Sequence, residues 1–479
     1  MSDSPRLGAK VRTLRRREGL TQVQLAEKMG ISASYLNLIE HNRRPLTAPL
    51  LIKLATLFNL DLQSFAADDE ARLVSELLEV FADGLFDDHD LKASDLREFA
   101  ATTPQVARAV VRLYEAYRGV REAADTLAAR VADGDEPPNG LDRDRIPSEE
   151  VHELLQRHTN HFPALEDAAE RLWRDARLDP NDIYRSMTDY LERRHGIEVR
   201  VISVSDSRGV MRRFDETQKR LYLSEALTPN SRNFQVAHQI GLLVASDTLN
   251  LVVDEARLSS DESRKLARVA LSNYFAGAVI MPYERFHEAA KAVRYDVEIL
   301  GHRFNSSFEQ ICHRLTTLRR PGLEGVPFHM IRVDIAGNIS KRFSGSGIRF
   351  ARFSGACPKW NVHAAFQLPG QVRVQLSRMP DGTSYFCVAR TVSRGHIGYH
   401  GTHNMQAVGL GCDVSYAREL VYADGVDLDN TEAAVPIGVT CRLCERVDCT
   451  QRAIPPLHHP LKVDENTRGL SFYAPVVDR

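Results

Sequence analysis

The segment TQVQLAEKMGISASYLNLIEHNRR, residues 21–44, decides how the first part of this chain folds. Thr21 can cap a short amphipathic helix that ends at Gly30, because glycine readily adopts the left-handed conformation that stops a helix. Ser32 can cap a second helix whose apolar side chains recur at helical spacing. The same spacing over residues 10–62 predicts four short helices around a small core, with no strand among them.

The second helix of this segment has a polar face of the kind that reads DNA. Short hydroxyl and amide side chains near its start can reach base edges, and neighbouring arginines can neutralise phosphates. Residues 1–65 hold ten Lys and Arg against five Asp and Glu, whereas the whole chain has a net charge of -2. The predicted DNA-contacting residues are Arg15, Arg16, Ser32, Ser34, Tyr35, Asn37, Asn42, Arg43 and Arg44.

This segment resembles the Cro/C1-type helix-turn-helix family over most of residues 1–65. In that family the Gln at the start of the second helix contacts phosphate and braces the recognition helix, so the resemblance assigns that role to Gln22. The alternative is a small helical bundle that only shows a solvated basic face. Charge, caps and spacing together favour the DNA-binding interpretation and double-stranded operator DNA as the partner.

Length and composition indicate the number of domains and the class of protein. The chain has 479 residues, which at ~100–200 residues per domain predicts roughly three domains. Hydrophobic residues make up 43% and charged residues 26%, as in an ordinary soluble protein. No apolar run approaches the ~18–20 residues of a membrane span, and the N-terminus lacks the apolar core of a signal peptide. We therefore expect a cytoplasmic protein with no membrane partner, whose seven cysteines are thiols or metal ligands.

Residues 66–135 are predicted to form a helical connecting and dimerisation region. Residues 67–98 hold eleven acidic residues against three basic ones, so this stretch is not expected to touch DNA. Thr103 and Pro104 mark the start of a long helix. Its apolar residues follow a 3.5-residue repeat, which is typical of a helix packed along a helical partner: Val106, Val110, Leu113, Tyr117, Val120, Ala124, Leu127 and Val131.

That partner is either a second subunit or, within one chain, the predicted helix over residues 70–83. We expect a homodimer or larger assembly, because helix-turn-helix proteins gain affinity by binding two half-sites. The run after Val131 is rich in Asp, Gly and Pro and is the clearest linker in the chain.

Residues 150–320 are predicted to form an α+β domain with strands at IEVRVISV and KRLYLS. The segment FQVAHQIGLLV and its surroundings resemble the IrrE/ImmA family of zinc peptidases, which hold zinc with two His one turn apart and use a Glu between them as general base. His238 is present, but the other positions have changed: Gln239 replaces the base, Leu242 replaces the second His, and Val269 and Leu271 fill positions where an acidic third ligand is sought.

An amide cannot take a proton from water at pH 7, and leucine cannot bind zinc. We therefore predict that the chain is not an enzyme, and we interpret His238 as a hydrogen-bonded core residue. A domain that has lost its chemistry can still keep a pocket for a small molecule.

Residues 321–479 are predicted to form a second α+β domain, a C-terminal ligand and metal-cluster domain rich in antiparallel strands. Cys441, Cys444 and Cys449 form a C-x2-C-x4-C motif, and thiols this close together indicate a bound cation or cluster. Cys412 is the predicted fourth ligand because it follows a Gly-Leu-Gly run that can bring its sulfur close. Cys357 or a histidine of the His458/His459 pair is the alternative.

All-cysteine ligation and nearby arginines favour a [4Fe–4S] cluster, whereas zinc accepts mixed Cys and His ligands and stays open as the alternative. The fold class is therefore a multidomain one: an all-α helix-turn-helix head (1–65) and helical arm, followed by an α+β IrrE-like domain and an α+β C-terminal regulatory domain.

The order of these blocks resembles the short-chain fatty acyl transcriptional regulators, which include the propionate and acetate regulators of actinobacteria. The resemblance implies a transcription factor of propionate, acetate, glyoxylate or methylcitrate metabolism. It also implies control by short-chain acyl-CoA, with an iron–sulfur cluster near the ligand site that could respond to redox state. The alternative function is a metal-dependent enzyme, either a residual zinc peptidase or a CoA-using catalyst, with an attached DNA-binding domain.

An acyl-CoA effector needs basic residues for its phosphates and an aromatic or apolar face for its adenine. Arginines and aromatic residues alternate in the C-terminal domain, although this pattern is also typical of a half-buried strand. The predicted acyl-CoA-binding residues are Lys341, Arg342, Arg349, Arg352, Trp360 and Arg390.

Overall fold

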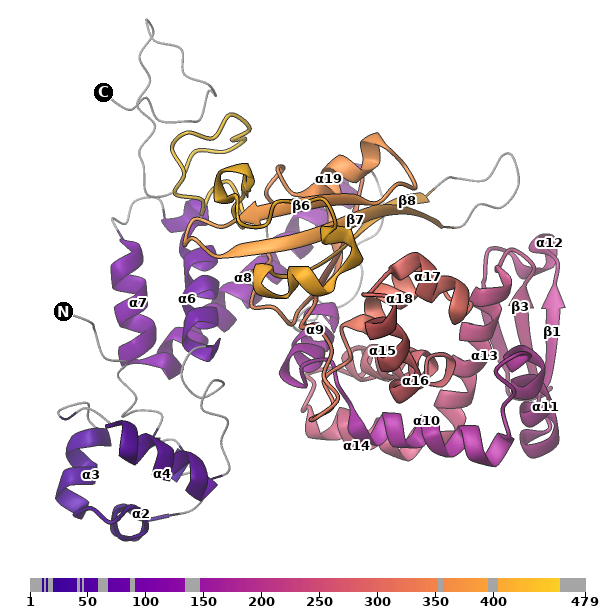
Figure 1. The fold of residues 1–479 in the computed structure, drawn as a ribbon, viewed down its shortest axis with the longest axis horizontal. Helices are drawn as coiled ribbons and strands as arrows, with labels where there is room; N and C mark the ends of the chain where they lie inside the picture. The colour runs from indigo at the N-terminus through magenta and orange to yellow at the C-terminus, as the bar shows by residue number, and fades with distance from the viewer. Residues whose placement is uncertain are drawn as a thin grey trace, which may run out of the picture. The chain divides into compact units, whose positions relative to one another are not determined.

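The computed structural model describes residues 11–12, 14–15, 20–40, 44, 47–58, 68–86, 91–133, 147–351, 356–394 and 404–456. The chain divides into two compact units, residues 1–114 and 115–479 (Figure 1). The predicted fold class is confirmed, since helices make up the first unit and helices and sheets the second. No single helix in the described ranges has the length and apolar composition of a membrane span; the bent pair α13 (Pro229–Val244) and α14 (Ser246–Glu255) passes only when taken together.

The head of the first unit is a small helical bundle, as predicted. Its described helices are α2 (Gln22–Met29), α3 (Ala33–Glu40) and α4 (Ala48–Phe58). Thr21 caps α2 through a capping box with Gln24, and Gly30 ends the helix in the left-handed region at φ 67°. The core contains Val11, Leu14, Leu25, Ala26, Met29, Leu36 and Leu54.

The remaining helices of the first unit are α6 (Asp68–Phe81), the short η1 (Gly84–Phe86), α7 (Ala93–Thr102) and the start of α8 (Pro104–Asp133). The long helix begins at Pro104, where the sequence predicted it. Ala107, Val111 and Tyr114 of α8 are buried, and the Tyr114 hydroxyl donates to Asp83 Oδ2 at 2.8 Å. One face of α8 therefore packs against the rest of the first unit.

The middle part of the chain is mostly helical. Its helices are α9 (Pro147–Arg157), α10 (Pro163–Ala176), α11 (Ile183–His195), α12 (Val204–Ser207), α13 (Pro229–Val244), α14 (Ser246–Glu255), α15 (Asp261–Ile280), α16 (Tyr283–Ala292), α17 (Val297–Arg303) and α18 (Phe308–Leu315). The two predicted strands are present as β1 (Glu198–Ile202) and β3 (Arg220–Ser224), which pair in parallel. A third strand that was not predicted, β2 (Arg212–Asp215), adds antiparallel to β3 at the sheet edge.

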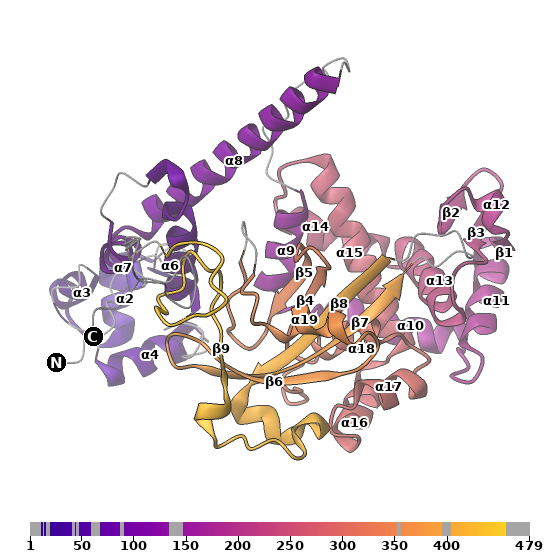
Figure 2. The same ribbon diagram turned by 90° about the horizontal axis from the view of Figure 1, so that it is seen from above.

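The C-terminal part is built on a six-stranded sheet in the order β5-β4-β8-β7-β6-β9 (Figure 2). The strands are β4 (His329–Asp334), β5 (Ile339–Ser344), β6 (Arg373–Arg378), β7 (Ser384–Arg394), β8 (Asn404–Asp413) and β9 (Val435–Pro436). Short helices connect them: α19 (Asn361–Ala364), η2 (Ala365–Gln367), η3 (Val414–Glu419), η4 (Val421–Ala423) and η5 (Thr431–Ala433). All pairings are antiparallel except that of β6 with β9.

The two faces of this sheet belong to two cores, because side chains alternate along a strand. Phe386 and Val388 of β7 face the core that the sheet shares with the helices of the middle part. Ala389 of β7 and Ala407 of β8 face a second core that includes Trp360. The middle and C-terminal parts therefore fold as one body around the first core.

Candidate functional site

The polar face of α3 is accessible, as a DNA-reading helix requires. Ser32, Ser34, Asn37 and Arg44 are exposed and Tyr35 is half-buried. The Ser32 hydroxyl accepts a hydrogen bond from the Tyr35 amide at 3.1 Å, which caps the start of α3. Four other residues predicted to bind DNA or ligand, Arg16, Asn42, Arg43 and Arg352, lie outside the described residues.

Arg15 forms a set of contacts within the helical head. Its guanidinium forms a paired salt bridge with Glu40 at the end of α3, at 2.6 and 3.0 Å, and also donates to the Leu20 carbonyl. The Glu40 side chain is fully buried, so its charge needs a nearby cation, which Arg15 supplies. The phosphate contact of Arg15 stays a prediction. Gln22 Nε2 also donates to Glu40, at 2.8 Å, so Gln22 contacts the recognition helix.

The degenerate zinc helix holds His238 in a buried, hydrogen-bonded position. Its Nδ1 donates to Asn273 Oδ1 of α15 at 2.9 Å, and its Nε2 is buried without a partner among the described residues. Burial first, and then the charge of Arg212, lower the pKa of His238 to about 4, so the ring is neutral at pH 7. The residue of α15 that contacts His238 is Asn273, and no acidic residue stands at Val269 or Leu271.

Arg212 changes the electrostatics of this relict site. Its Nη1 donates to Gln239 Oε1 at 3.3 Å, so a guanidinium contacts the residue that replaces the catalytic base. A fixed positive charge here disfavours a divalent cation. Within the described ranges, no three His, Cys, Asp or Glu side chains are arranged to hold a metal ion.

The cysteine triplet lies on a loop beside β9, and the structure brings a fourth cysteine to it. Cys357, Cys441, Cys444 and Cys449 line one small cavity, together with Arg446 and Arg452. Burial raises the pKa of the Cys357 thiol, and the neighbouring sulfurs of Cys441 and Cys444 add to the effect. The Cys357 backbone N–H donates a hydrogen bond to the Val439 carbonyl at 3.1 Å. This bond fixes the loop of Cys357 against the loop that carries the cysteine triplet.

Two features keep this cavity open and its loop in place. A Cβ on Gly438 would lie 2.9 Å from Cys444 Sγ, so only glycine lets the loop pass the sulfur. The Arg452 guanidinium donates to the carbonyls of Cys441 and Cys444 at 2.5 and 2.8 Å. Arg452 thus holds the backbone of the motif in one conformation.

Cys412 lies elsewhere, and the prediction that it joins the triplet is not supported by its position. It is fully buried in β8, opposite Phe386, in the core shared with the helices. The Gly-Leu-Gly run before it is part of a central strand and not a flexible loop. A Cβ on Gly409 would meet Val362 at 2.5 Å, and one on Gly411 would meet His329 at 2.5 Å. These glycines make room for packed neighbours.

The residues predicted to bind acyl-CoA are not brought together at one cavity. Lys341 pairs with Glu309 at 3.1 Å, and Arg342 pairs with Glu149. Lys341 and Arg342 are neighbours on β5, but their partners lie on different helices, α18 and α9. Arg390 pairs with Glu298 at 2.8 Å, Arg349 is exposed, and Trp360 is buried against Phe350. The alternating pattern is therefore explained by ion pairs that join the sheet to the helices.

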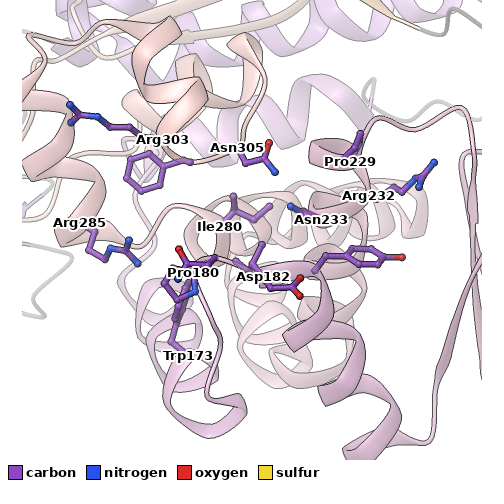
Figure 3. A pocket seen from close by; sticks show the side chains of 14 residues that line it. Trp173, Pro180, Asp182, Pro229, Arg232, Asn233, Ile280, Arg285, Arg303 and Asn305 are labelled. Carbon is purple, nitrogen blue, oxygen red and sulfur yellow. The ribbon is translucent and has the colours of Figure 1, made fainter.

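A larger cavity lies in the middle part of the chain, where no ligand-binding residues were predicted. It has a volume of about 320 Å³ and lies among α10, α11, α13, α15, α16 and the end of α17 (Figure 3). Arg232 and Arg303 lie at its opposite ends, with Asn233, Ile280 and Asn305 between them. Ligand pockets in proteins have volumes of ~300–1,000 Å³, so this one is large enough for part of a coenzyme.

The helix-turn-helix head, the accessible recognition helix and the altered zinc helix together define a DNA-binding transcriptional regulator. The chain belongs to the family of the short-chain fatty acyl coenzyme A regulators. The model of their C-terminal region matches residues 317–473, an IrrE N-terminal-like domain matches residues 192–316, and a helix-turn-helix matches residues 11–65.

Relatives match over almost their whole length. The HTH-type transcriptional regulator PrpR of Mycobacterium tuberculosis is 40% identical over 96% of this chain and 93% of its own. The propionyl-CoA carboxylase regulator of Cereibacter sphaeroides is 40% identical over 97% and 98%. A solved structure of a Mycobacterium tuberculosis transcriptional regulator is 41% identical, covers 69% of this chain and 99% of its own, and has a TM-score of 0.65. Because these relatives are named regulators, the comparison agrees with a non-enzymatic function.

Proposed function

We propose that this protein is a dimeric transcription factor that controls short-chain acyl metabolism in response to short-chain acyl-CoA and carries a [4Fe–4S] cluster. The DNA-binding part of this proposal rests on the accessible polar face of α3 in a helix-turn-helix head. The name of one relative, a propionyl-CoA carboxylase regulator, supports propionate metabolism as the controlled process.

The exposed seam of α8 supports the dimer. Val106 and Leu113 of the 3.5-residue repeat are 53% and 72% exposed, and Tyr117 is also exposed. The residues of α8 that are buried within the chain are different ones: Ala107, Val111 and Tyr114. The repeat is therefore not explained by packing within the described part of the chain, and a second copy of α8 is the partner we propose. The side chains of Val120, Ala124, Leu127 and Val131 lie outside the described residues.

The cysteine cavity supports the cluster, with a revised ligand set. Four cysteines line one small cavity, and iron–sulfur clusters need all-cysteine ligation, so we propose Cys357 in place of Cys412 as the fourth ligand. In this structure the four side chains are not arranged as a metal site, so cluster binding would have to draw the thiols together. Such a cluster would supply electron transfer or oxygen sensitivity when bound. The two histidines considered for a zinc site, His458 and His459, lie outside the described residues. Zinc held by four thiolates stays the alternative occupant.

The experiment that tests the function is operator binding with and without effector. Purified protein should bind DNA from the promoters of propionate or acetate genes more tightly than random DNA. Propionyl-CoA or acetyl-CoA should change that affinity, whereas free CoA and free propionate serve as controls. Binding that is equal on promoter and random DNA, with no effect of any acyl-CoA, would contradict the proposal.

A further inference from the structure

The cavity of the middle part (Figure 3) has an arginine rim with unused positive charge. Arg285 and Arg303 are exposed and form no ion pair with any described residue, and Arg232 donates only to the Glu225 carbonyl, with its Nε left without a partner. Other arginines of this region are paired, such as Arg320 with Glu170. Three cations around one opening without carboxylate partners favour an anionic ligand.

The N-termini of two helices add to the positive electrostatic potential of the cavity, because both helices begin there. The first residues of α11, Ile183 and Tyr184, and those of α13, Pro229 and Arg232, line it. These helices have 13 and 16 residues, and neither carries an acidic residue in its first turn. Helix N-termini carry partial positive charge and free amide groups, which stabilise a phosphate. The acid nearby is Asp182, whose carboxylate is committed to capping α11.

The interior of the cavity is less charged than its rim. Asn233 is almost fully buried and its side-chain amide forms no hydrogen bond with the described residues, so this amide is available to a ligand. Trp173 contributes an aromatic wall, and its indole is fixed by a 2.8 Å hydrogen bond to the Val279 carbonyl. Phe304 adds a second aromatic ring, and the exposed Asn305 adds a second amide at the edge of the cavity. An aromatic wall with amide donors and acceptors suits a nucleobase and ribose.

We infer that this cavity binds a phosphorylated nucleoside, with the base and ribose inside and the phosphates at the arginine rim. The volume of about 320 Å³ holds a nucleoside end and not a whole acyl-CoA. The inference rests on the proposed function in one respect, since the adenosine 3′,5′-bisphosphate end of CoA is the phosphorylated nucleoside that an acyl-CoA effector would present. It places effector binding in the relict peptidase domain instead of the C-terminal domain.

Calorimetry on the full-length protein tests this inference, with adenosine 3′,5′-bisphosphate and CoA as probes and adenosine as the uncharged comparison. We expect both phosphorylated probes to bind and compete with each other, and adenosine to bind much more weakly. Arg232→Gln, Arg285→Gln and Arg303→Gln should each weaken binding by about tenfold, because each removes a charge-assisted contact from the rim. Arg193→Gln is the matched control, since Arg193 is exposed on the other half of α11.

The two tryptophans of the chain provide a second, positional readout. Trp173 lines the cavity and Trp360 lies in the C-terminal part. In Trp360→Phe protein the remaining fluorescence comes from Trp173, and adenosine 3′,5′-bisphosphate should change it in a saturable way. In Trp173→Phe protein the same probe should leave the Trp360 emission almost unchanged.

The outcomes separate this inference from the proposed function. If CoA binds with the same affinity after all three rim substitutions and perturbs Trp360 instead, the cavity assignment is wrong while the acyl-CoA response stands. If adenosine 3′,5′-bisphosphate binds and the rim variants lose it, the cavity assignment stands even where acyl-CoA leaves DNA affinity unchanged. If no phosphorylated nucleoside binds at all, the inference is overturned.

Discussion

At the residue scale, Arg15 shows that a basic side chain near a recognition helix can stabilise the fold of the head. It neutralises the buried Glu40 and so joins the first helical turn to the end of α3. We expect Arg15→Ala to lower the free energy of unfolding of the head by ~3 kcal/mol, because a buried charge is left without its partner. The double variant Arg15→Met/Glu40→Leu should lose much less. Chemical denaturation measures both, and equal losses would contradict the buried-pair explanation.

The same pair predicts a pH dependence. Hydrogen bonds from Arg15 and Gln22 outweigh the effect of burial and hold the pKa of Glu40 below its ordinary value. A carboxyl group with a lowered folded-state pKa stabilises the protein above its unfolded-state pKa, and this contribution is lost as pH falls through the folded-state value. The head of the wild-type protein should therefore lose stability in acid over that range. Protein with Glu40→Gln should lack this part of the pH profile.

Cys357 and Cys412 give a second test at the residue scale. Both are buried, but only Cys357 shares a cavity with the triplet. We expect anaerobically purified protein to be brown, with about four irons and four sulfides per chain. Cys357→Ser should bleach it as Cys441→Ser does, whereas Cys412→Ser should keep the colour and only destabilise the core. Retained colour in the Cys357 variant, or stoichiometric zinc without sulfide, would contradict the assignment.

At the scale of the element, α3 separates two kinds of DNA contact. Asn37 is on its exposed face and Arg44 follows its end, where phosphates are expected. Arg44→Ala should weaken binding to operator and random DNA alike and reduce the salt dependence by about one phosphate contact. Asn37→Ala should cost ~1–3 kcal/mol on the operator and change sequence preference. Salt titrations on both DNAs measure these affinities. Equal effects of the two variants would show that the recognition face is assigned to the wrong residues.

The helix α8 predicts where the dimer forms. Leu113→Asn places an amide in the proposed apolar seam and should dissociate the dimer, while Arg112→Asn beside it, also exposed, should not. Sedimentation over a range of protein concentrations measures the difference. A Leu113 variant that stays dimeric at the lowest concentration would place the interface on another surface.

At the scale of the whole molecule, the middle and C-terminal parts share a core while the head has its own. The shared core runs from Val151 to Ala423, so residues 147–479 contain all of it. We expect this fragment to unfold in one cooperative transition and to bind adenosine 3′,5′-bisphosphate like the full chain, without binding DNA. Calorimetric unfolding with two separate transitions would show that the two parts are independent domains.

The sequence by itself determined the helix-turn-helix head, the start of α8 and the loss of the peptidase chemistry. Each depends on residues close together in the chain: the capping box at Thr21, the proline at Pro104, and Gln239 one position after His238. Caps and helical spacing act over a few residues, so they can be read without the rest of the fold. The disposition of Ser34 and Asn37 on one exposed helix face follows from the same local periodicity.

The tertiary structure alone decided which distant residues meet. It brought Cys357 to the triplet, although Cys412 is closer in sequence, because β8 is a central strand and a strand has no freedom to move one cysteine to a loop. It paired Arg15 with Glu40 and Arg342 with Glu149, contacts that no local pattern encodes. It also formed the arginine-rimmed cavity from six helices and their ends. Such contacts depend on how elements pack, and packing depends on the entire core.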